Sequence, residues 1–142
     1  GGSLVQIEYD GARATEDIDL VPIRHPTLSD VRAQDELFKA AHELGLDAES
    51  VNSAARFFLG DFPNWHSELI EWRRGPVGAV FKPSLALFVA MKLRRGTDVD
   101  LSDIRSAIRK EVKAGFKAAR FRKLSDAKLQ ARFDAHRARL GI

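Results

Sequence analysis

The spacing of apolar residues changes along this chain of 142 residues, and that change limits the folds it can adopt. The early segment 17–21 alternates charged and apolar side chains, which is typical of a half-buried strand. Beyond Pro83 the apolar residues recur every three or four positions, which predicts helices. A few strands followed by helices indicate an α+β fold. We expect a small mixed sheet flanked by helices, with a helical C-terminal portion.

Capping residues and turn residues predict the first elements. Ser29 or Asp30 begins a helix that runs to about residue 44, and Gly45 ends it. Leu37, Phe38, Ala41 and Leu44 would form its apolar face. A second helical stretch is expected over 48–57. The segments 68–72 and 77–81 predict a hairpin, with 73–76 between the strands.

Three helices are expected after the hairpin. The first covers 84–94, with Pro83 as its first helical residue. The second begins near Ser102 and would bury a stripe of residues four apart, namely Ile104, Ile108, Val112 and Phe116. The third begins near Ser125 and has an apolar face formed by Leu129, Phe133 and Leu140.

Composition excludes several classes of protein. The chain has no cysteine, so it forms neither disulfides nor thiolate metal sites. No apolar run approaches the roughly 18 residues that a membrane-spanning helix requires. No secretory signal is visible, so we expect a cytoplasmic protein.

Charge is distributed unevenly. Residues 1–72 contain 5 Lys/Arg and 14 Asp/Glu, whereas residues 73–142 contain 18 Lys/Arg and 6 Asp/Glu. This split indicates an acidic, metal-attracting half and a basic, polyanion-attracting half. The alternative interpretation is two solvated faces that neutralise each other. We expect a core over residues 1–100, with a basic helical region, residues 101–142, packed on it.

Asp17 and Asp19 are the main candidate site. Residues two apart on a strand point to the same side, so their carboxylates would lie together. Paired carboxylates suit Mg²⁺, which in turn binds the phosphates of a nucleotide. A solvated Asp-x-Asp pair is the alternative.

The surrounding residues resemble a known superfamily. Gly1-Gly2-Ser3, followed by Arg13 and Asp17-Ile18-Asp19, is similar to the signature of polymerase-β-like nucleotidyltransferases. The Arg-x-Thr-x-Asp-x-Asp form looks most like the minimal bacterial members, including AbiEii-type abortive-infection toxins. A second block, Lys92 followed by Asp100-Leu101-Ser102-Asp103, resembles a later segment of such proteins. The resemblance covers about residues 1–110.

The resemblance implies roles for these residues. Asp17 and Asp19 would hold Mg²⁺ or Mn²⁺, and Lys92 would be catalytic and contact the triphosphate. Asp100 or Asp103 would fix that lysine or position the acceptor. The remaining nucleotide-binding residues would be Gly1, Gly2, Ser3, Arg13 and Asp100. The alternatives are a linker or cloning scar at residues 1–3, a solvated Lys92, helix-capping Asp100 and Asp103, and a surface ion pair of Arg13.

Two departures from the superfamily pattern matter. A strand and a helix normally precede the Gly-Gly, so we expect that the chain is truncated before Gly1. Active members also have a third carboxylate on a later strand, and Glu71 is the best candidate for this metal ligand. Without a third carboxylate, metal binding would be weaker.

A basic stripe is the second candidate site. Arg105, Arg109, Lys113 and Lys117 recur every four residues and predict a nucleic-acid-binding helix face. A solvated face or a surface for an acidic partner protein are the alternatives. Four histidines are scattered without the spacing of zinc ligands.

These features lead to two main hypotheses. The first is a Mg²⁺-dependent nucleotidyltransferase that transfers a nucleotide from a nucleoside triphosphate to a hydroxyl of RNA, such as tRNA, or of protein. It would act as the toxin of a toxin–antitoxin pair, with a cognate antitoxin as partner. The second is a catalytically degenerate module of the same fold that binds RNA or a partner protein. A purely structural role is a third interpretation.

Overall fold

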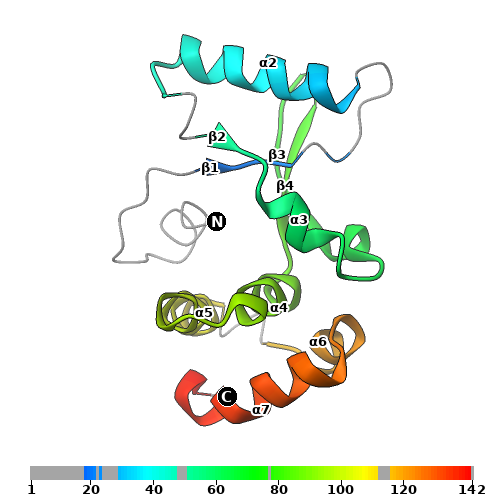
Figure 1. The fold of residues 1–142 in the computed structure, drawn as a ribbon, viewed down its shortest axis with the longest axis vertical. Helices are drawn as coiled ribbons and strands as arrows, with labels where there is room; N and C mark the ends of the chain where they lie inside the picture. The colour runs from blue at the N-terminus through cyan, green and yellow to red at the C-terminus, as the bar shows by residue number, and fades with distance from the viewer. Residues whose placement is uncertain are drawn as a thin grey trace. The chain divides into compact units, whose positions relative to one another are not determined.

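The structure is a computed structural model, and it describes residues 18–21, 23, 29–47, 51–76, 78–111 and 116–141 (Figure 1). The chain divides into two compact units, residues 1–58 and 59–142, and each is described by itself. The division expected near residue 100 would instead fall inside helix α5 (Asp98–Lys110). Helix α5 packs against the helix that precedes it, and a division near residue 100 stays a prediction.

The first unit contains a short parallel ladder and a helix. Strand β1 (Ile18–Asp19) pairs with β2 (Val51–Asn52), in the register Ile18 to Val51 and Asp19 to Asn52. The Leu20 amide extends the ladder by donating to the Asn52 carbonyl oxygen at 2.8 Å. The predicted strand around Asp19 is confirmed for these residues. The helix predicted over 48–57 is wrong at residues 51–52, where buried Val51 pairs in the ladder.

Helix α2 (Asp30–Glu43) follows its predicted bounds closely. The Ser29 hydroxyl caps it by accepting from the Arg32 amide, and Gly45 after it has a φ of 72°, which glycine adopts without steric cost. Its predicted apolar face is only partly buried, since Ala41 is covered while Phe38 and Leu44 are exposed. Helix α3 (Ala55–Leu59) crosses the division between the units.

The second unit begins with a hairpin. A 3-10 helix, η2 (Trp65–Glu68), leads into β3 (Leu69–Arg74), which pairs antiparallel with β4 (Ala79–Pro83). The hairpin prediction is confirmed, and Pro76 lies in the turn rather than in a strand. The described strands form two separate two-stranded ladders, not one mixed sheet. The α+β class is confirmed.

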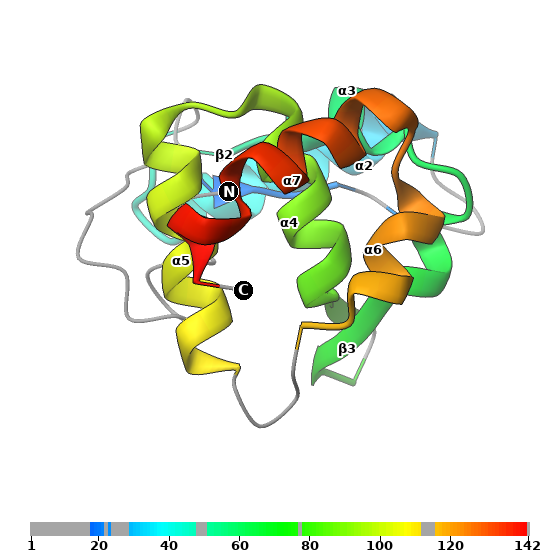
Figure 2. The same ribbon diagram turned by 90° about the horizontal axis from the view of Figure 1, so that it is seen from below.

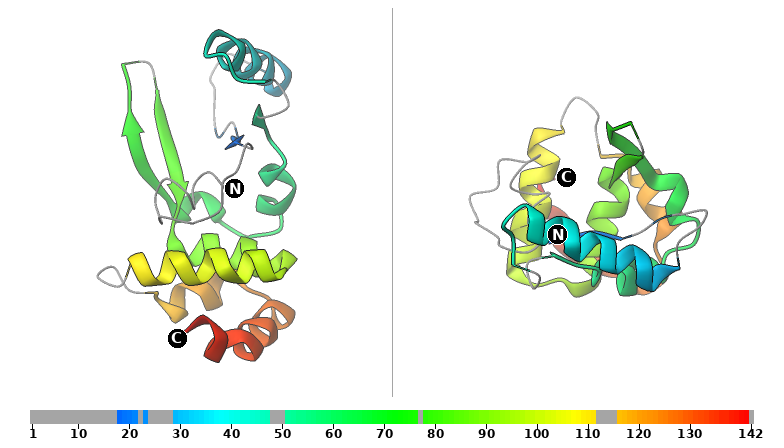
Figure 3. Two further views of the ribbon diagram at one scale, coloured as in Figure 1. Left: turned by 90° about the vertical axis from the view of Figure 1, so that its left-hand side faces the viewer. Right: turned by 90° about the horizontal axis from the view of Figure 1, so that it is seen from above.

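Helices make up the rest of the second unit. They are α4 (Leu85–Arg95), α5, α6 (Ala118–Leu124) and α7 (Ala127–Leu140), and α4 contacts all three others (Figures 2 and 3). Pro83 ends β4 instead of starting α4, because the Ser84 hydroxyl caps the helix by accepting from the Leu87 amide at 3.2 Å. None of the helices in the described parts of the chain is long and apolar enough to cross a membrane.

Helix α4 is the centre of this unit. Its residues from Leu85 to Ala90, together with Lys92 and Leu93, are buried. A helix that is apolar almost all round its circumference has to be covered on every side. This explains why three helices pack against it.

The predicted course of the second C-terminal helix is wrong. Helix α5 starts at Asp98 and ends at Lys110, so the apolar residues spaced four apart do not share one helix. Ile104 is buried on α5, Val112 lies outside the described residues, and Phe116 lies beyond the helix. Helix α6, which was not expected, begins two residues after Phe116.

An aromatic cluster joins the last two helices. The ring centroids of Phe121 on α6 and Phe133 on α7 are 4.6 Å apart, and Phe116 lies 5.4 Å from Phe133. Offset aromatic contacts at these distances stabilise a core beyond the burial of their area. The predicted apolar face of α7 is confirmed, since Leu129, Phe133 and Leu140 are all buried.

Replacing Phe121 with alanine should lower the free energy of unfolding by about 3–5 kcal/mol, because the change opens a cavity in this cluster. Phe57→Ala is the matched control, since that side chain is 84% exposed. It should change the free energy by less than about 0.5 kcal/mol. Urea denaturation followed by circular dichroism measures both. Equal effects would contradict the assignment of Phe121 to the core.

Candidate functional site

The predicted carboxylate pair is only partly described. Asp19 lies on β1, and its side chain is half-buried. Its strand partner Asn52 uses its side-chain oxygen to accept from the Ala54 amide at 3.0 Å. The pairing with Asn52 was not expected, because two residues of strand leave too little pattern to detect. Six predicted site residues lie outside the described residues: Gly1, Gly2, Ser3, Arg13, Asp17 and Lys113.

Glu71, the predicted third metal ligand, is engaged by a neighbouring cation. Its carboxylate accepts hydrogen bonds from Nε and Nη2 of Arg74, the first at 2.9 Å. The hydrogen bonding by Arg74 lowers the pKa of Glu71. Glu71 belongs to the second unit and Asp19 to the first. Within the described ranges, no three His, Asp or Glu side chains are grouped so that they could hold a metal ion.

Lys92 is buried beside two carboxylates. Its side chain projects from α4, and the residue is only 8% exposed. The ammonium nitrogen donates to Oδ2 of Asp103 at 2.6 Å and lies 3.4 Å from Oδ1 of Asp100. A buried ammonium is costly unless it is paired and hydrogen-bonded. These two carboxylates, both on α5, meet that requirement.

Asp100 is the most enclosed member of this cluster, with no exposed surface. It accepts from Nε of Arg95 at 2.8 Å, and from the backbone amide and the hydroxyl of Thr97 at 3.1 and 2.7 Å. The Asp100 amide donates back to the Thr97 hydroxyl at 3.2 Å, which completes a capping box at the start of α5. Burial alone would raise the pKa of Asp100, but the hydrogen bonds from Arg95 and Thr97 and the charge of Lys92 outweigh it, so the pKa lies far below its ordinary value.

Helix α7 also holds the turn between α4 and α5. Arg132 on α7 donates from Nη1 to the carbonyl oxygens of Leu93 and Arg94, at 3.2 and 2.7 Å. These carbonyls end α4 and have no partner within the helix. Gly96 follows with a φ of 69°. Helices α4, α5 and α7 therefore meet at this turn, which we call the α4–α5 corner.

This corner changes the interpretation of Lys92. Two cations, Lys92 and Arg95, face two carboxylates, so the cluster is neutral. A direct contact between Lys92 and a triphosphate would require the pair with Asp103 to open. The sequence predicted that Asp100 or Asp103 would fix this lysine, and both lie beside it. Asp100 also caps α5, as the alternative interpretation held. Arg95, Thr97 and Arg132 were not expected, although Thr97 three residues before Asp100 is the spacing of a capping box.

The predicted basic stripe is not a single helix face. Arg105 and Arg109 lie on α5, but that helix ends at Lys110. Lys117 is the residue that precedes α6. Arg105 is half-buried, whereas Arg109 and Lys117 are exposed. The four-residue spacing is therefore interrupted by a break between two helices.

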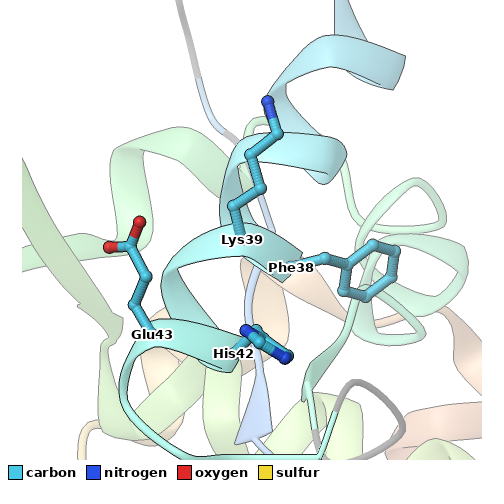
Figure 4. Close-up of a pocket in the computed structure, with 4 residues that line it drawn as sticks. All are labelled: Phe38, Lys39, His42 and Glu43. Atoms are coloured by element: carbon cyan, nitrogen blue, oxygen red, sulfur yellow. The ribbon is translucent and has the colours of Figure 1, made fainter.

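An open hollow on α2 offers no built site. Phe38, Lys39, His42 and Glu43 line it, all from one helix (Figure 4). The Lys39 ammonium is paired with Glu36 at 2.8 Å. The residues project apart from one another in Figure 4. Nothing there brings reactive groups together.

Replacing Lys92 with methionine should lower the free energy of unfolding by about 3–5 kcal/mol, because it leaves buried carboxylates without their cation. The double variant Lys92→Met/Asp103→Leu should recover part of that loss. Lys39→Met is the control, since its ion pair on α2 is exposed, and it should unfold like the parent. A double variant no more stable than the single one would argue against this pairing.

The stability conferred by Asp100 should depend on pH. Folding lowers the pKa of this carboxyl, so its charge stabilises the fold above the ordinary value of 3.8, and this contribution is lost as the pH falls below that value. The difference in unfolding free energy between the parent and Asp100→Asn should be constant from about pH 7 to 5 and shrink below about pH 4. Urea titrations at several pH values measure it. A difference that does not vary with pH would mean that the carboxylate charge is not the stabilising element.

Comparison with known proteins adds no family to these observations. No protein-family model, curated protein or solved structure matches the chain. The nucleotidyltransferase resemblance therefore depends on the motif residues themselves.

Proposed function

We propose that this chain is a Mg²⁺-dependent nucleotidyltransferase that transfers a nucleotide from a nucleoside triphosphate to a hydroxyl group of RNA or protein. The observation that carries the proposal is the second aspartate of the Arg-x-Thr-x-Asp-x-Asp run lying on a strand. Asp19 ends β1, which is paired in parallel with β2. A strand that included Asp17 as well would place both carboxylates on one side, which is the geometry that the chemistry needs.

The chemistry follows from strand geometry. Alternate residues of a strand share a side, so Asp17 is expected on the same side as Asp19. Two carboxylates held together bind Mg²⁺, and Mn²⁺ is the alternative ion. The ion would orient the triphosphate, polarise its phosphoryl group and help to activate the acceptor hydroxyl. Gly1, Gly2, Ser3 and Arg13 are the proposed phosphate contacts.

Lys92 takes a different role in this proposal from the one that the sequence resemblance implied. Because its ammonium is buried against Asp103 and Asp100, it stabilises the corner between α4 and α5. Glu71 is likewise held by Arg74, so the proposal relies on Asp17 and Asp19 alone as metal ligands. Action as the toxin of a toxin–antitoxin pair, with a cognate antitoxin as partner, belongs to the same proposal.

A second candidate is a module without catalytic activity that binds RNA or a partner protein. The excess of cations in the second unit favours it, since residues 59–142 contain 18 Lys/Arg and 9 Asp/Glu. Binding by such a module would not need Asp17 or Asp19. The two candidates therefore differ in their response to the loss of those carboxylates.

Asp19→Asn keeps the shape of the side chain and removes its charge. Incubation with labelled nucleoside triphosphates, Mg²⁺ and total tRNA or cell lysate should label a macromolecule, and Asp19→Asn should slow that labelling by at least about a hundredfold, because a lost metal ligand removes several kcal/mol of transition-state stabilisation. Chelation of the metal should abolish the label.

Asp35→Asn on α2 is the matched control, because it makes the same chemical change at an exposed position of the same unit. It should label at the rate of the parent. Absence of any label with every nucleotide, or equal labelling by the parent and Asp19→Asn, would contradict a transferase centred on Asp19. The degenerate module would then be the better interpretation.

A further inference from the structure

The second unit cannot neutralise its own positive charge. Seven of its nine acidic residues form ion pairs with cations of the same unit: Asp61, Glu68, Glu71, Asp98, Asp100, Asp103 and Glu111. An eighth, Asp126, caps α7 by accepting from the Leu129 amide. Eight of the nine carboxylates are thus already engaged, and a surplus of cations faces the solvent. Such a surplus attracts polyanions.

Part of this surplus is concentrated on α6. Phe121 and Leu124 face the core, so Arg122 and Lys123 project outward and are exposed. Lys117, which precedes the helix, is exposed as well. These three cations have no ion-pair partner within the described part of the chain. They are available to external phosphates.

A pair of stacked rings lies close to this helix. Trp65 and His66 on η2 stack with centroids 3.7 Å apart and planes inclined by 25°. Trp65 is half-buried, and His66 is exposed. An exposed ring backed by a second ring offers a flat surface on which a nucleobase can stack.

Glu68 connects the rings to the basic helix. It ends η2, and its Oε1 accepts from Nε of Arg120 on α6 at 3.3 Å. Its other oxygen accepts from the Ser84 hydroxyl at 2.5 Å, which fixes the carboxylate. Figure 2 shows α6 beside the start of β3, where η2 ends. The rings and the cations are therefore held on neighbouring elements of one unit.

We propose that the η2–α6 surface, formed by Trp65, His66, Lys117, Arg122 and Lys123, binds single-stranded RNA. The cations would contact successive phosphates, while an unpaired base stacks on the exposed ring of His66. An acidic protein would supply charge but no bases, and a duplex would keep its bases stacked internally. This inference names RNA as the acceptor of the proposed transfer, and in that respect it rests on the proposed function.

Fluorescence anisotropy with a labelled oligouridylate tests the surface on the full chain. The double variant Arg122→Gln/Lys123→Gln should weaken binding and reduce the slope of log affinity against log salt by about 1.4, since each phosphate contact on a single strand contributes about 0.7. His66→Ala should weaken binding by about tenfold and leave the slope unchanged, because it removes a stacking contact and no charge contact.

The matched control is Lys39→Gln/Arg139→Gln, which removes the same amount of charge from exposed positions on α2 and α7. It should retain the salt slope of the parent. Equal losses in the two double variants would mean that overall charge, not this surface, attracts RNA, and would overturn the proposal. So would equally tight binding of duplex RNA or polyglutamate, or full binding by His66→Ala.

The same titration separates this inference from the transferase proposal. Asp19→Asn should bind the oligouridylate as tightly as the parent. If the parent binds the oligouridylate but transfers no label, the transferase proposal fails and the RNA-binding surface stands. If the parent labels a protein acceptor but does not bind the oligouridylate, the transferase proposal stands and the RNA-binding surface fails.

Discussion

The ion pair between Lys92 and the carboxylates of Asp103 and Asp100 is the interaction on which the second unit depends. Helix α4 is buried on almost every side, so a lysine in it must find its counter-charge within the protein. Both carboxylates come from α5, which determines how the two helices meet. Arg95 and Thr97 then donate hydrogen bonds to the other oxygen of Asp100, Oδ2. Because α6 and α7 also pack on α4, the whole helical cluster is organised around this corner.

The burial of Lys92 at this corner also changes which residues are proposed to bind substrate. The charge of Lys92 is balanced by Asp103 and Asp100, so the proposal places the chemistry on the carboxylates of the first unit. Other cations face the solvent, among them Arg122 and Lys123 on α6 and Lys117 before it. The chain thus combines a proposed metal site in an acidic unit with a proposed polyanion surface in a basic one. Each can be tested without the other.

Local sequence signals predicted the elements whose ends are set by their own residues. Ser29 and Gly45 bound α2, the turn containing Pro76 separates β3 from β4, and Leu129 and Phe133 mark the buried face of α7. Elements that depend on distant partners were missed or misplaced. Strand β2 exists through its pairing with β1 more than 30 residues earlier in the chain, and local composition there favoured a helix. The break between α5 and α6 interrupts the four-residue spacing of apolar residues, which by itself predicts one continuous helix.

The sequence by itself determined the α+β class, the unequal distribution of charge and the strand at Asp19, because periodicity, composition and short motifs are properties of neighbouring residues. Only the tertiary structure decided which charged groups are buried and paired within the protein. Lys92 and Lys117 have the same side chain, yet one is enclosed by carboxylates and the other is exposed. That difference comes from packing, since burial raises the cost of an unpaired charge and so selects its partners, whereas a charge in water needs none.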